Sequence, residues 1–332
     1  NDYITMLENE QIDFVSICLP THLHHFAATE AIKRKINVLC EKPLAVNAAE
    51  GRKMIETARF KGVLLMEAMI STLNPNFTAA VSRIKEIEPV RQYSSYFCQY
   101  SSKYEALKRG EVASSFMPGT AGALRDIGVY TLYPLVALFG RPVSVHGKLR
   151  TLETSAGTSD ICGTADLEYP EMSATLTWSK TFDSFQPTEI AGENGNLILD
   201  EIHIARKAEI VPHAAPTSGL GPKPGRTVIG EGLPYNEYYY EFKEFADLVA
   251  IGTVGDIMPL VDEHRKMGEF ILSGSQNFHL QEAISQSLAG RCATLKLLPL
   301  SHREINGKSN HDIFQLGNEE VTTGKAISAF EQ

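Results

Sequence analysis

Three short apolar runs, separated by two helical stretches, fill most of the first 70 or so residues. The runs lie at residues 12–19, 37–40 and 63–66. Between them, residues 22–35 carry apolar side chains at helical spacing, and Asn47 followed by Glu50 is the start signal of a helix that runs to about Lys61. Strands that alternate with helices at this spacing predict βαβ units. The fold class is therefore α/β, with a parallel sheet in the first part of the chain.

Beyond about residue 75 the predicted strands follow one another with few helices between them. β-forming segments lie at residues 90–100, 143–149, 160–168, 172–180, 189–190, 197–199 and 202–210. The main interruption is a Gly/Ala-rich loop that leads into a helix at residues 126–139. Strands in succession predict a largely antiparallel, open sheet, so we expect the second domain to be α+β.

Two segments follow these strands. Residues 214–232 contain many Pro and Gly residues and predict a loop. Residues 235–249 predict an amphipathic helix. The expected apolar side of this helix consists of Tyr239, Phe242, Phe245, Ala246 and Val249.

The charge balance excludes several kinds of partner. The 332 residues include 31 Lys and Arg against 40 Asp and Glu, a net charge of −9. An acidic chain without a basic run does not suit nucleic acid or an anionic membrane surface. The uncharged stretch at residues 127–140 contains Pro134 and is too short to span a bilayer. We therefore expect neither a nucleic-acid partner nor a membrane partner.

The cysteines and histidines predict no metal site. The five cysteines, at positions 18, 40, 98, 162 and 292, form no C-x-x-C pair. An odd number without such pairs argues against a disulfide framework and against zinc. His22, His24 and His25 lie close together but have no metal-binding motif around them. Free thiols favour a cytoplasmic location.

Polar motifs follow the first two predicted strands. Pro20 and Thr21 open the segment PTHLH after the first strand, and the tripeptide Glu41-Lys42-Pro43 follows the second. In a parallel sheet, ligands bind outside the carboxyl ends of the strands, where both motifs fall. In the later helix, Asp126 and Tyr130 are four residues apart and share a face.

These motifs lie in or beside three longer segments, which are VLCEKPLAVNAAEG (38–51), LMEAM (65–69) and GALRDIGVYTLYPLVALFG (122–140). In this order they resemble the glucose–fructose oxidoreductase / inositol dehydrogenase (Gfo/Idh/MocA) family over about residues 1–250. The resemblance implies an incomplete Rossmann-like domain at residues 1–72 and a substrate and oligomerisation domain at residues 73–252. It also implies NAD or NADP as cofactor, a sugar, polyol or cyclic diol as substrate, and a homo-oligomer, either a dimer or a tetramer.

The residue types suit the oxidation of a secondary alcohol, which needs a base for the hydroxyl proton while hydride leaves the carbon. A Lys42 ammonium can hydrogen-bond the substrate oxygen and lower the pKa of an adjacent Tyr130 phenol, which then acts as general base. Asp126, one turn away, can orient the substrate or offset the lysine charge. The family often has histidine where this chain has Tyr130, whereas its glucose–fructose oxidoreductase-like members have tyrosine.

The same residues have simpler interpretations. Tyr130 lies near Tyr133 and could pack in the core, and Asp126 could be only a helix N-cap. The cofactor-binding residues that the resemblance implies are Pro20, Thr21, His24, Glu41 and Lys42. For His24, a structural role at the start of its helix is a close alternative.

The sequence contains no G-x-G-x-x-G turn, the element that places the pyrophosphate of a dinucleotide at a helix N-terminus. Compared with the family pattern, we therefore expect at least one βαβ unit, of roughly 30 residues or more, to be absent from this sequence. The alternative is an inactive family remnant that acts at most as a binding or interaction module. An upstream segment would favour the enzyme, and a true start at Asn1 would favour the remnant.

Residues 253–332 depart from the family pattern. Residues 256–300 resemble a fragment of an AAA-type ATPase, with FILSGSQN (270–277) as its sensor strand and LAGR (288–291) as its arginine-bearing turn. A phosphate-binding loop needs the motif G-x-x-x-x-G-K-[ST], of which Gly307-Lys308-Ser309 has only the end. We interpret the tail as a fused segment that does not hydrolyse ATP. An ATPase-related partner module is a third functional hypothesis.

Overall fold

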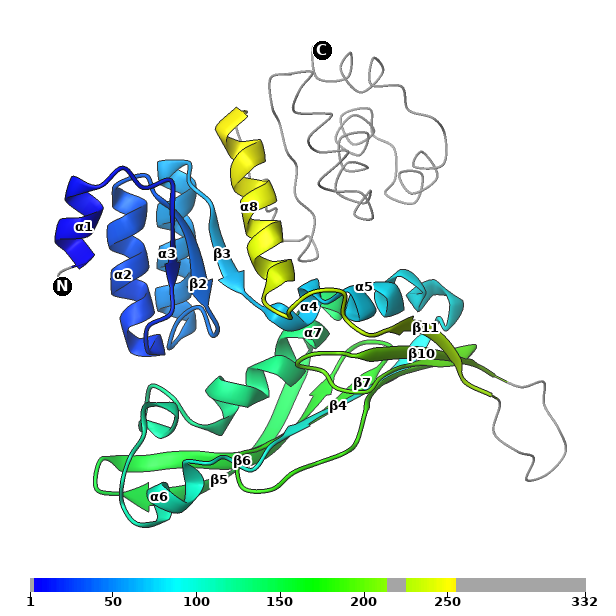
Figure 1. Ribbon diagram of the computed structural model, residues 1–332. Coiled ribbons are helices and arrows are strands. Elements are labelled where there is room, and N and C mark those ends of the chain that lie inside the picture. The colour runs from blue at the N-terminus through cyan, green and yellow to red at the C-terminus, as the bar shows by residue number, and fades with distance from the viewer. Residues whose placement is uncertain (1–2, 214–224, 255–332) are drawn as a thin grey trace, which may run out of the picture.

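The computed structural model describes residues 3–213 and 225–254, whose strands form two separate sheets (Figure 1). The first sheet has three strands in the order β1-β2-β3, and the second has eight in the order β11-β10-β9-β8-β4-β7-β6-β5. The predicted fold class is confirmed, because a small Rossmann-like parallel sheet is followed by a mixed, mostly antiparallel one. No helix in these ranges is both long enough and apolar enough to cross a bilayer.

The first sheet alternates strands with helices, as the apolar runs predict. Its elements are α1 (Tyr3–Asn9), β1 (Phe14–Ile17), α2 (Thr21–Lys33), β2 (Asn37–Glu41), α3 (Ala48–Lys61) and β3 (Leu65–Ala68). The predicted start of α3 is confirmed: the Asn47 side chain accepts a hydrogen bond from the Glu50 N–H (3.0 Å) and donates one to Glu50 Oε1 (2.9 Å). At the other end, Gly62 adopts the left-handed conformation that terminates many helices.

Helices cover both faces of the first sheet. On one face, α2 and α3 bury a cluster against the strands that includes Ile32 and Met54. On the other face lies α8 (Tyr239–Val254), whose Phe245 packs with Leu39 of β2. Although α8 follows the second sheet in sequence, it lies beside β3 of the first (Figure 1). The last described helix therefore completes the core around the first sheet.

The buried side of α8 differs from the prediction for residues 235–249. Phe245 is buried, as expected, but Tyr239 and Phe242 are 40% and 43% exposed. Val249 packs against the same cluster as Phe245, as expected, whereas Tyr240, Glu241 and Leu248 are buried without having been predicted. Apolar residues occur around most of this helix, so the sequence alone does not show which face is buried. Packing against the first sheet determines that face.

The second part of the chain contains short helices and the eight-stranded sheet. The helical segments are α4 (Ile70–Leu73), α5 (Pro75–Ser82), η1 (Ile84–Glu86), α6 (Tyr104–Lys108), η2 (Ser114–Phe116), η3 (Leu124–Gly128) and α7 (Val129–Phe139). The strands are β4 (Val90–Cys98), β5 (Ser144–Thr154), β6 (Gly157–Glu168), β7 (Ser173–Ser179), β8 (Thr188–Gly192), β9 (Gly195–Leu199), β10 (Lys207–Pro212) and β11 (Thr227–Glu231). Among the described strand pairs of this sheet, only β4 and β7 run parallel.

The prediction of a loop over residues 214–232 is wrong in part. Residues 227–231 form β11, which pairs antiparallel with β10. Their Thr-Val-Ile sequence is β-forming, but the Pro and Gly residues around it conceal this short strand. Residues 214–224 of the predicted loop lie outside the described residues.

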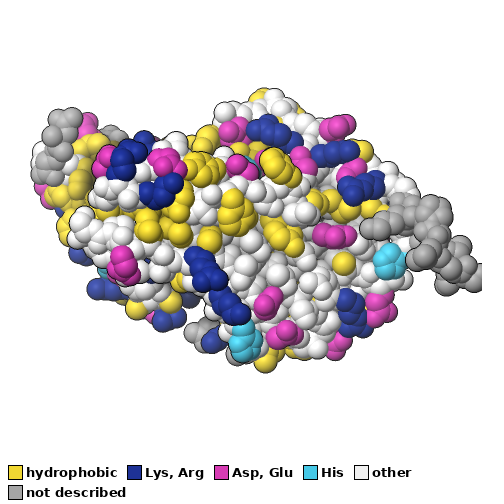
Figure 2. Space-filling view, turned by 90° about the horizontal axis from the view of Figure 1, so that it is seen from below, with side chains coloured by type: hydrophobic (Ala, Val, Ile, Leu, Met, Phe, Trp, Pro, Cys, Tyr) yellow, Lys and Arg dark blue, Asp and Glu magenta, His cyan; other side chains and the backbone are white. Residues whose placement is uncertain are grey.

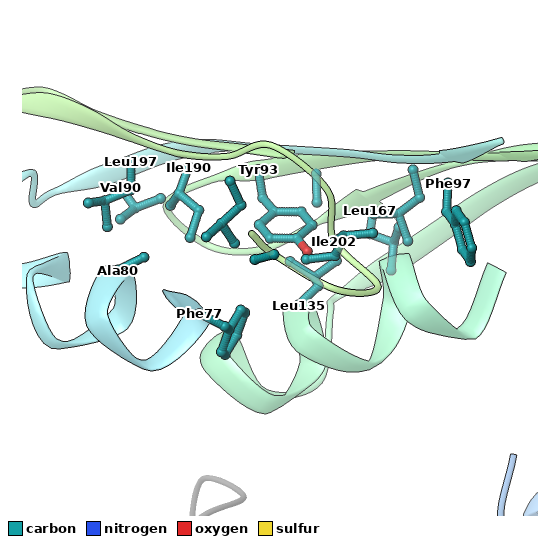
Figure 3. Close-up of a cluster of buried hydrophobic side chains, with 14 of the residues drawn as sticks. Phe77, Ala80, Val90, Tyr93, Phe97, Leu135, Leu167, Ile190, Leu197 and Ile202 are labelled. Carbon is teal, nitrogen blue, oxygen red and sulfur yellow. The ribbon is translucent and has the colours of Figure 1, made fainter. Parts of the chain in front are cut away.

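The core of the second part lies between the sheet and helices α5 and α7. Figure 3 shows side chains of both layers meeting there, with Phe77 and Leu135 from the helices and Tyr93 and Ile190 from the strands. All four are almost completely buried. Burial of one side chain of this size contributes roughly 1.5–3 kcal/mol. This cluster holds α7, and with it the candidate catalytic residues, against the sheet.

The other face of the second sheet is largely open in the described part of the chain, with the short helix α6 near one end of it (Figure 1). Along β6 and β7, Leu167 and Leu176 are buried toward the helices, whereas Thr164 and Thr177 alternate with such residues and point away. Figure 2 shows the molecule from this side, where uncharged polar side chains and backbone separate scattered charged and apolar groups.

Gly122 fixes the loop that leads into η3. It has a φ of 120°, and a Cβ at this position would lie 1.8 Å from Asp160 Oδ1 of β6. The Asp160 carboxylate accepts a hydrogen bond from the Leu124 N–H (2.7 Å), so it cannot move away without losing that bond. Both the conformation and the space therefore require glycine.

We expect Gly122→Ala to lower the free energy of unfolding by about 2 kcal/mol or more, because it adds backbone strain and a steric clash. Chemical denaturation followed by circular dichroism measures this loss. Gly62→Ala is the matched control, since Gly62 also has a positive φ but a Cβ there would meet no atom within 4 Å. Its expected loss is about 1 kcal/mol. Equal losses in the two variants would contradict the steric role of Asp160.

Candidate active site

The turn after β2 presents Lys42. The Lys42–Pro43 peptide bond in this turn is cis. The Leu44 N–H donates a hydrogen bond to Glu67 Oε1 (2.8 Å), and the Pro43 carbonyl lies 3.0 Å from His24 Nδ1. These contacts fix the turn to β3 and α2, so the Lys42 side chain extends from a backbone that is held in place.

The contacts of His24 fit the structural role that the sequence left as an alternative, and its contact with a cofactor stays a prediction. It is buried, and its Nε2 lies 2.7 Å from the Leu19 carbonyl, just after β1. Because Nδ1 contacts the Pro43 carbonyl, both ring nitrogens are engaged with backbone oxygens. The ring therefore links the end of β1 to the Lys42 turn, and it presents no free ring nitrogen to a ligand.

The Lys42 side chain reaches from the first sheet to the segment before α7. Its Nζ donates to the Asp126 carbonyl oxygen (2.7 Å) and approaches Asp126 Oδ1 at 3.3 Å. Asp126 lies in η3, a π-helical turn that directly precedes α7. The predicted helix at residues 126–139 is thus corrected at its start, where the Val129 N–H donates to the Leu124 carbonyl. Such wide turns are frequent at functional sites.

Tyr130, in the first turn of α7, contacts the same ammonium. The Lys42 Nζ lies 4.9 Å from the centroid of the Tyr130 ring, which is within the range of a cation–π interaction. The fold therefore brings together the three residues that the sequence analysis proposes as catalytic, namely Lys42, Asp126 and Tyr130.

The predicted lowering of the Tyr130 pKa is not found in this structure. Burial raises the pKa of the phenol, and the negative charges of Glu41 and Asp126 raise it further. Lys42 lies over the face of the ring and directs two N–H groups to Asp126, so it does not offset these effects. Tyr130 is consequently a neutral phenol, and hence a proton donor, at neutral pH.

Lys180 belongs to the same cluster, although the sequence analysis does not identify it. It directly follows β7, and its side chain is 5% exposed. Its Nζ donates to Asp126 Oδ2 and to the Ser115 carbonyl (3.2 Å). Burial acts to raise the pKa of Asp126, but Lys180 and Lys42 outweigh it and hold this pKa below its usual value. No local pattern marks a lysine after a strand as buried, so only the fold reveals this residue.

Two aromatic rings border Tyr130. Phe97, on β4, meets the Tyr130 ring edge-on at 5.4 Å, and His203 stacks on Phe97 at 4.2 Å. Burial lowers the pKa of His203 to about 4, so its ring is neutral at neutral pH. Both residues come from segments far from the recognised motifs, which is why no sequence signal points to them.

The remaining predicted cofactor-binding residues lie at one edge of the first sheet. Pro20 immediately precedes α2, and Thr21 is its first residue. Glu41 is the last residue of β2, and its Oε2 accepts a hydrogen bond from the Lys42 N–H (3.2 Å). All of them follow the carboxyl ends of the parallel strands β1 and β2. Their contact with a cofactor stays a prediction.

Within residues 3–213 and 225–254, no group of three or more His, Cys, Asp or Glu side chains is arranged to hold a metal ion. Cys18, Cys40, Cys98 and Cys162 are free thiols. Cys292 lies outside the described residues.

Known proteins match both parts of this architecture. A profile described as oxidoreductase family, NAD-binding Rossmann fold, matches residues 1–69, and a GFO/IDH/MocA C-terminal domain matches residues 84–198. The scyllo-inositol 2-dehydrogenase (NADP(+)) IolU of Bacillus subtilis (strain 168) is 37% identical over 253 residues, which are 75% of this chain and 73% of that protein. The chain belongs to the GFO/IDH/MocA oxidoreductase family. The resemblance seen in the sequence is thereby confirmed, and with it the NAD(P)-dependent reaction class.

Two further proteins illustrate the range of the family. YgjR of Escherichia coli (strain K12), an uncharacterized oxidoreductase, is 36% identical over 245 residues, or 74% of this chain and 71% of YgjR. Among solved structures, a levoglucosan dehydrogenase in complex with NADH and L-sorbose has a TM-score of 0.63 at 18% identity, covering 76% of this chain and 74% of the dehydrogenase. At this identity the similarity concerns the fold alone.

An AAA domain profile matches residues 252–306. This confirms the second resemblance, which the sequence analysis describes for residues 256–300. The expected sensor strand and arginine-bearing turn lie outside the described residues.

The residues present fit the nicotinamide end of NAD(P). In Rossmann-like sheets a dinucleotide lies across the carboxyl ends of the strands, where this chain has Pro20, Thr21 and Glu41 beside the Lys42 ammonium. Two of the three Nζ–H groups of Lys42 point to Asp126, which leaves one for a ligand oxygen. The sequence contains no glycine-rich phosphate loop, so these residues account for the nicotinamide end only.

Glu241 provides a pH test of this environment. It lies on the buried side of α8 and is 3% exposed. Burial, helped by the negative charge of Glu41, raises its pKa to about 7 from an ordinary value of 4.5. The folded protein therefore binds more protons than the unfolded chain between these two pH values, so stability falls as the pH rises through this window.

We expect Glu241→Gln to be more stable than the wild type at pH 8 and equally stable near pH 4, because the glutamine carries no charge to bury. The difference at pH 8 should be on the order of 1 kcal/mol. Thermal unfolding at both pH values measures it, with the exposed Glu56→Gln on α3 as control. A difference that stays constant with pH would contradict the buried-carboxyl description.

Proposed function

We propose that the protein is a dehydrogenase that interconverts a secondary alcohol and a ketone on a sugar, polyol or cyclic diol, with NAD or NADP. The observation that carries this proposal is the placement of the Lys42 ammonium, anchored by Asp126 at 2.7 Å, against the ring of Tyr130. A fixed cation beside a phenol is what proton transfer at an alcohol oxygen needs.

Lys42 binds the substrate oxygen in this mechanism. Two of its N–H groups stay on Asp126, and the third donates to the hydroxyl or ketone oxygen of the substrate. Its positive charge stabilises the negative charge that develops on this oxygen in the transition state. Because the turn that carries Lys42 is fixed by His24 and Glu67, the ammonium needs little reorganisation before the reaction.

Tyr130 transfers the proton. In the direction of ketone reduction, the phenol of Tyr130, which its raised pKa keeps protonated, donates a proton to the alkoxide oxygen. In the direction of alcohol oxidation, Tyr130 accepts the hydroxyl proton as the phenolate, which forms as the pH rises. Phe97 packs edge-on against the Tyr130 ring and His203 stacks on Phe97, so these two rings help to hold Tyr130 in place.

The carboxyl edge of the first sheet holds the nicotinamide end of the cofactor. Pro20, Thr21 and Glu41 border this position, and His24 keeps the two strand ends together. When bound, the nicotinamide ring accepts hydride from the alcohol carbon or returns it to the ketone. The similarity to a scyllo-inositol 2-dehydrogenase supports a carbohydrate or cyclitol substrate.

The test is a fluorescence titration of the full chain with NADPH and NADH, followed by an absorbance assay over inositols, sugars and polyols. We expect saturable cofactor binding and turnover of at least one cyclic polyol. Lys42→Met should lower kcat by about 100-fold or more, the usual size of an acid–base or electrostatic contribution. Lys53→Met, an exposed position on α3, is the matched control and should behave as the wild type.

Two outcomes would contradict the proposal. The absence of saturable binding at millimolar cofactor would favour the alternative that the chain is an inactive member that serves as a binding module. Unchanged turnover in Lys42→Met would place the chemistry elsewhere.

We also propose that the protein is a homo-oligomer, a dimer or a tetramer, in which the open face of the second sheet packs on another copy. Uncharged side chains such as Thr164 and Thr177 occupy this face, which is largely open in the described part of the chain. On the edge strand β5, Lys148 pairs with Thr164 and so lies on the same face.

Light scattering coupled to gel filtration should therefore give a mass of two or four times 36.6 kDa. Thr177→Arg, which places a charge on the open face, should shift the protein toward monomer, whereas Glu56→Arg on α3 should not. A monomeric wild type would contradict this interface.

A further inference from the structure

Lys180 is a buried cation that the mechanism above does not use. Its ammonium lies 4.1 Å from the centroid of the Phe116 ring and donates to the Ser115 carbonyl at 3.2 Å. Its third described contact is the ion pair with Asp126 Oδ2. A buried ammonium is unfavourable unless it is paired and hydrogen-bonded, and these contacts satisfy that requirement.

Asp126 is thus shared by two cations from different parts of the fold. Lys42, after β2, takes the backbone carbonyl at 2.7 Å and Oδ1 at 3.3 Å. Lys180, after β7, takes Oδ2. Two ammonium groups and one carboxylate leave one positive charge in excess. Since Oδ2 is engaged by Lys180, Lys42 keeps only one carboxylate oxygen, at the longer distance, and its charge is incompletely neutralised.

The charge of Asp126 also acts on Tyr130. Among the causes that raise the pKa of the Tyr130 phenol, Asp126 follows burial and Glu41. A cation on the far oxygen of Asp126 offsets part of this negative charge. Without it, Asp126 could still anchor Lys42, but its charge would make ionisation of Tyr130 more costly.

We propose that Lys180 is a positioning residue for the reaction: it holds Oδ2 of Asp126 and offsets its charge, so that Asp126 can anchor Lys42 without opposing proton transfer at Tyr130. This inference rests on the proposed function. It assigns a role to a residue that touches neither the Lys42 turn nor Tyr130 among the described contacts and that acts only through Asp126.

The kinetic test is the pH profile of alcohol oxidation in Lys180→Met and Lys180→Arg. Lys42 and Lys180 are the charged groups that act on Asp126. For Tyr130, the Lys42 ammonium lies over the ring, and the acidic groups that act on it are Glu41, Asp126, Tyr238 and Glu241. We expect Lys180→Met to move the rising limb of kcat to higher pH by about one unit, which is about a tenfold loss at a fixed pH on that limb.

The substrate KM should change by less than about twofold, because Lys180 does not contact the substrate. Lys180→Arg, which keeps the charge, should restore most of the profile, and Lys53→Met should leave it unchanged. If Lys180→Met instead lowers kcat equally at every pH without moving the limb, Lys180 is only structural and the inference is wrong.

A second measurement needs no turnover. In thermal unfolding of the chain, Lys180→Met should lower the Tm strongly in the wild-type background and much less in an Asp126→Asn background. Because the pKa of Asp126 is lowered in the folded state, its ion-pair stabilisation is present above the ordinary value of 3.8 and is lost as the pH falls through the folded pKa. The Tm difference between wild type and Lys180→Met should therefore shrink on acidification.

The two measurements separate the two proposals. If the wild type oxidises no alcohol, the proposed function fails, while the unfolding cycle still decides on the coupling between Lys180 and Asp126. The inference about Lys180 would be overturned, whether or not the protein is an enzyme, if the Tm losses in that cycle were additive and the Tm difference between wild type and Lys180→Met did not shrink at acid pH.

Discussion

The contact between the Lys42 ammonium and Asp126 is the interaction on which the candidate site depends, because it joins the two sheets of the molecule. Lys42 comes from a turn at the carboxyl edge of the parallel sheet, and Asp126 from the π turn before α7. Neither sheet alone contains a complete site. Once this contact forms, the Tyr130 ring, one helical turn further on, lies against the same ammonium.

Several rigid elements keep this contact in place. On one side, His24 ties the Lys42 turn to the end of β1. On the other, the Asp160 carboxylate holds the start of η3, in a space that Gly122 leaves open. Preorganisation of this kind matters because a catalytic charge stabilises a transition state most when it needs no rearrangement. The packing of α7 on the second sheet serves the same end.

Local features of the fold could be predicted from the sequence, and features that depend on distant contacts could not. The cap formed by Asn47 and Glu50 and the short apolar runs encode their own structure, so the parallel sheet follows from them. The buried side of α8 was predicted only in part, because the sheet that selects it lies about 180 residues earlier. Strand β11 was missed for a different reason. It has only three β-forming residues, and the many glycines and prolines around them predict a loop.

In the candidate site, too, residues in local motifs could be predicted from the sequence and residues that depend on distant contacts could not. Lys42, Asp126 and Tyr130 stand in recognisable motifs, and the fold places them together. Lys180 and His203 have no local signal, because their burial arises from strands that meet only in the folded chain. The expected effect of Lys42 on the Tyr130 pKa failed because distance along the sequence gives no measure of burial, which dominates that pKa.

The most direct measurement is a crystal structure of the full chain with NADPH and a cyclic polyol that the protein oxidises. We expect the reacting hydroxyl to lie within hydrogen-bonding distance of both Lys42 Nζ and Tyr130 Oη, with Lys42 still bonded to Asp126. A polyol bound away from these two groups, or a Lys42 side chain turned away from Asp126 in the complex, would contradict the central claim.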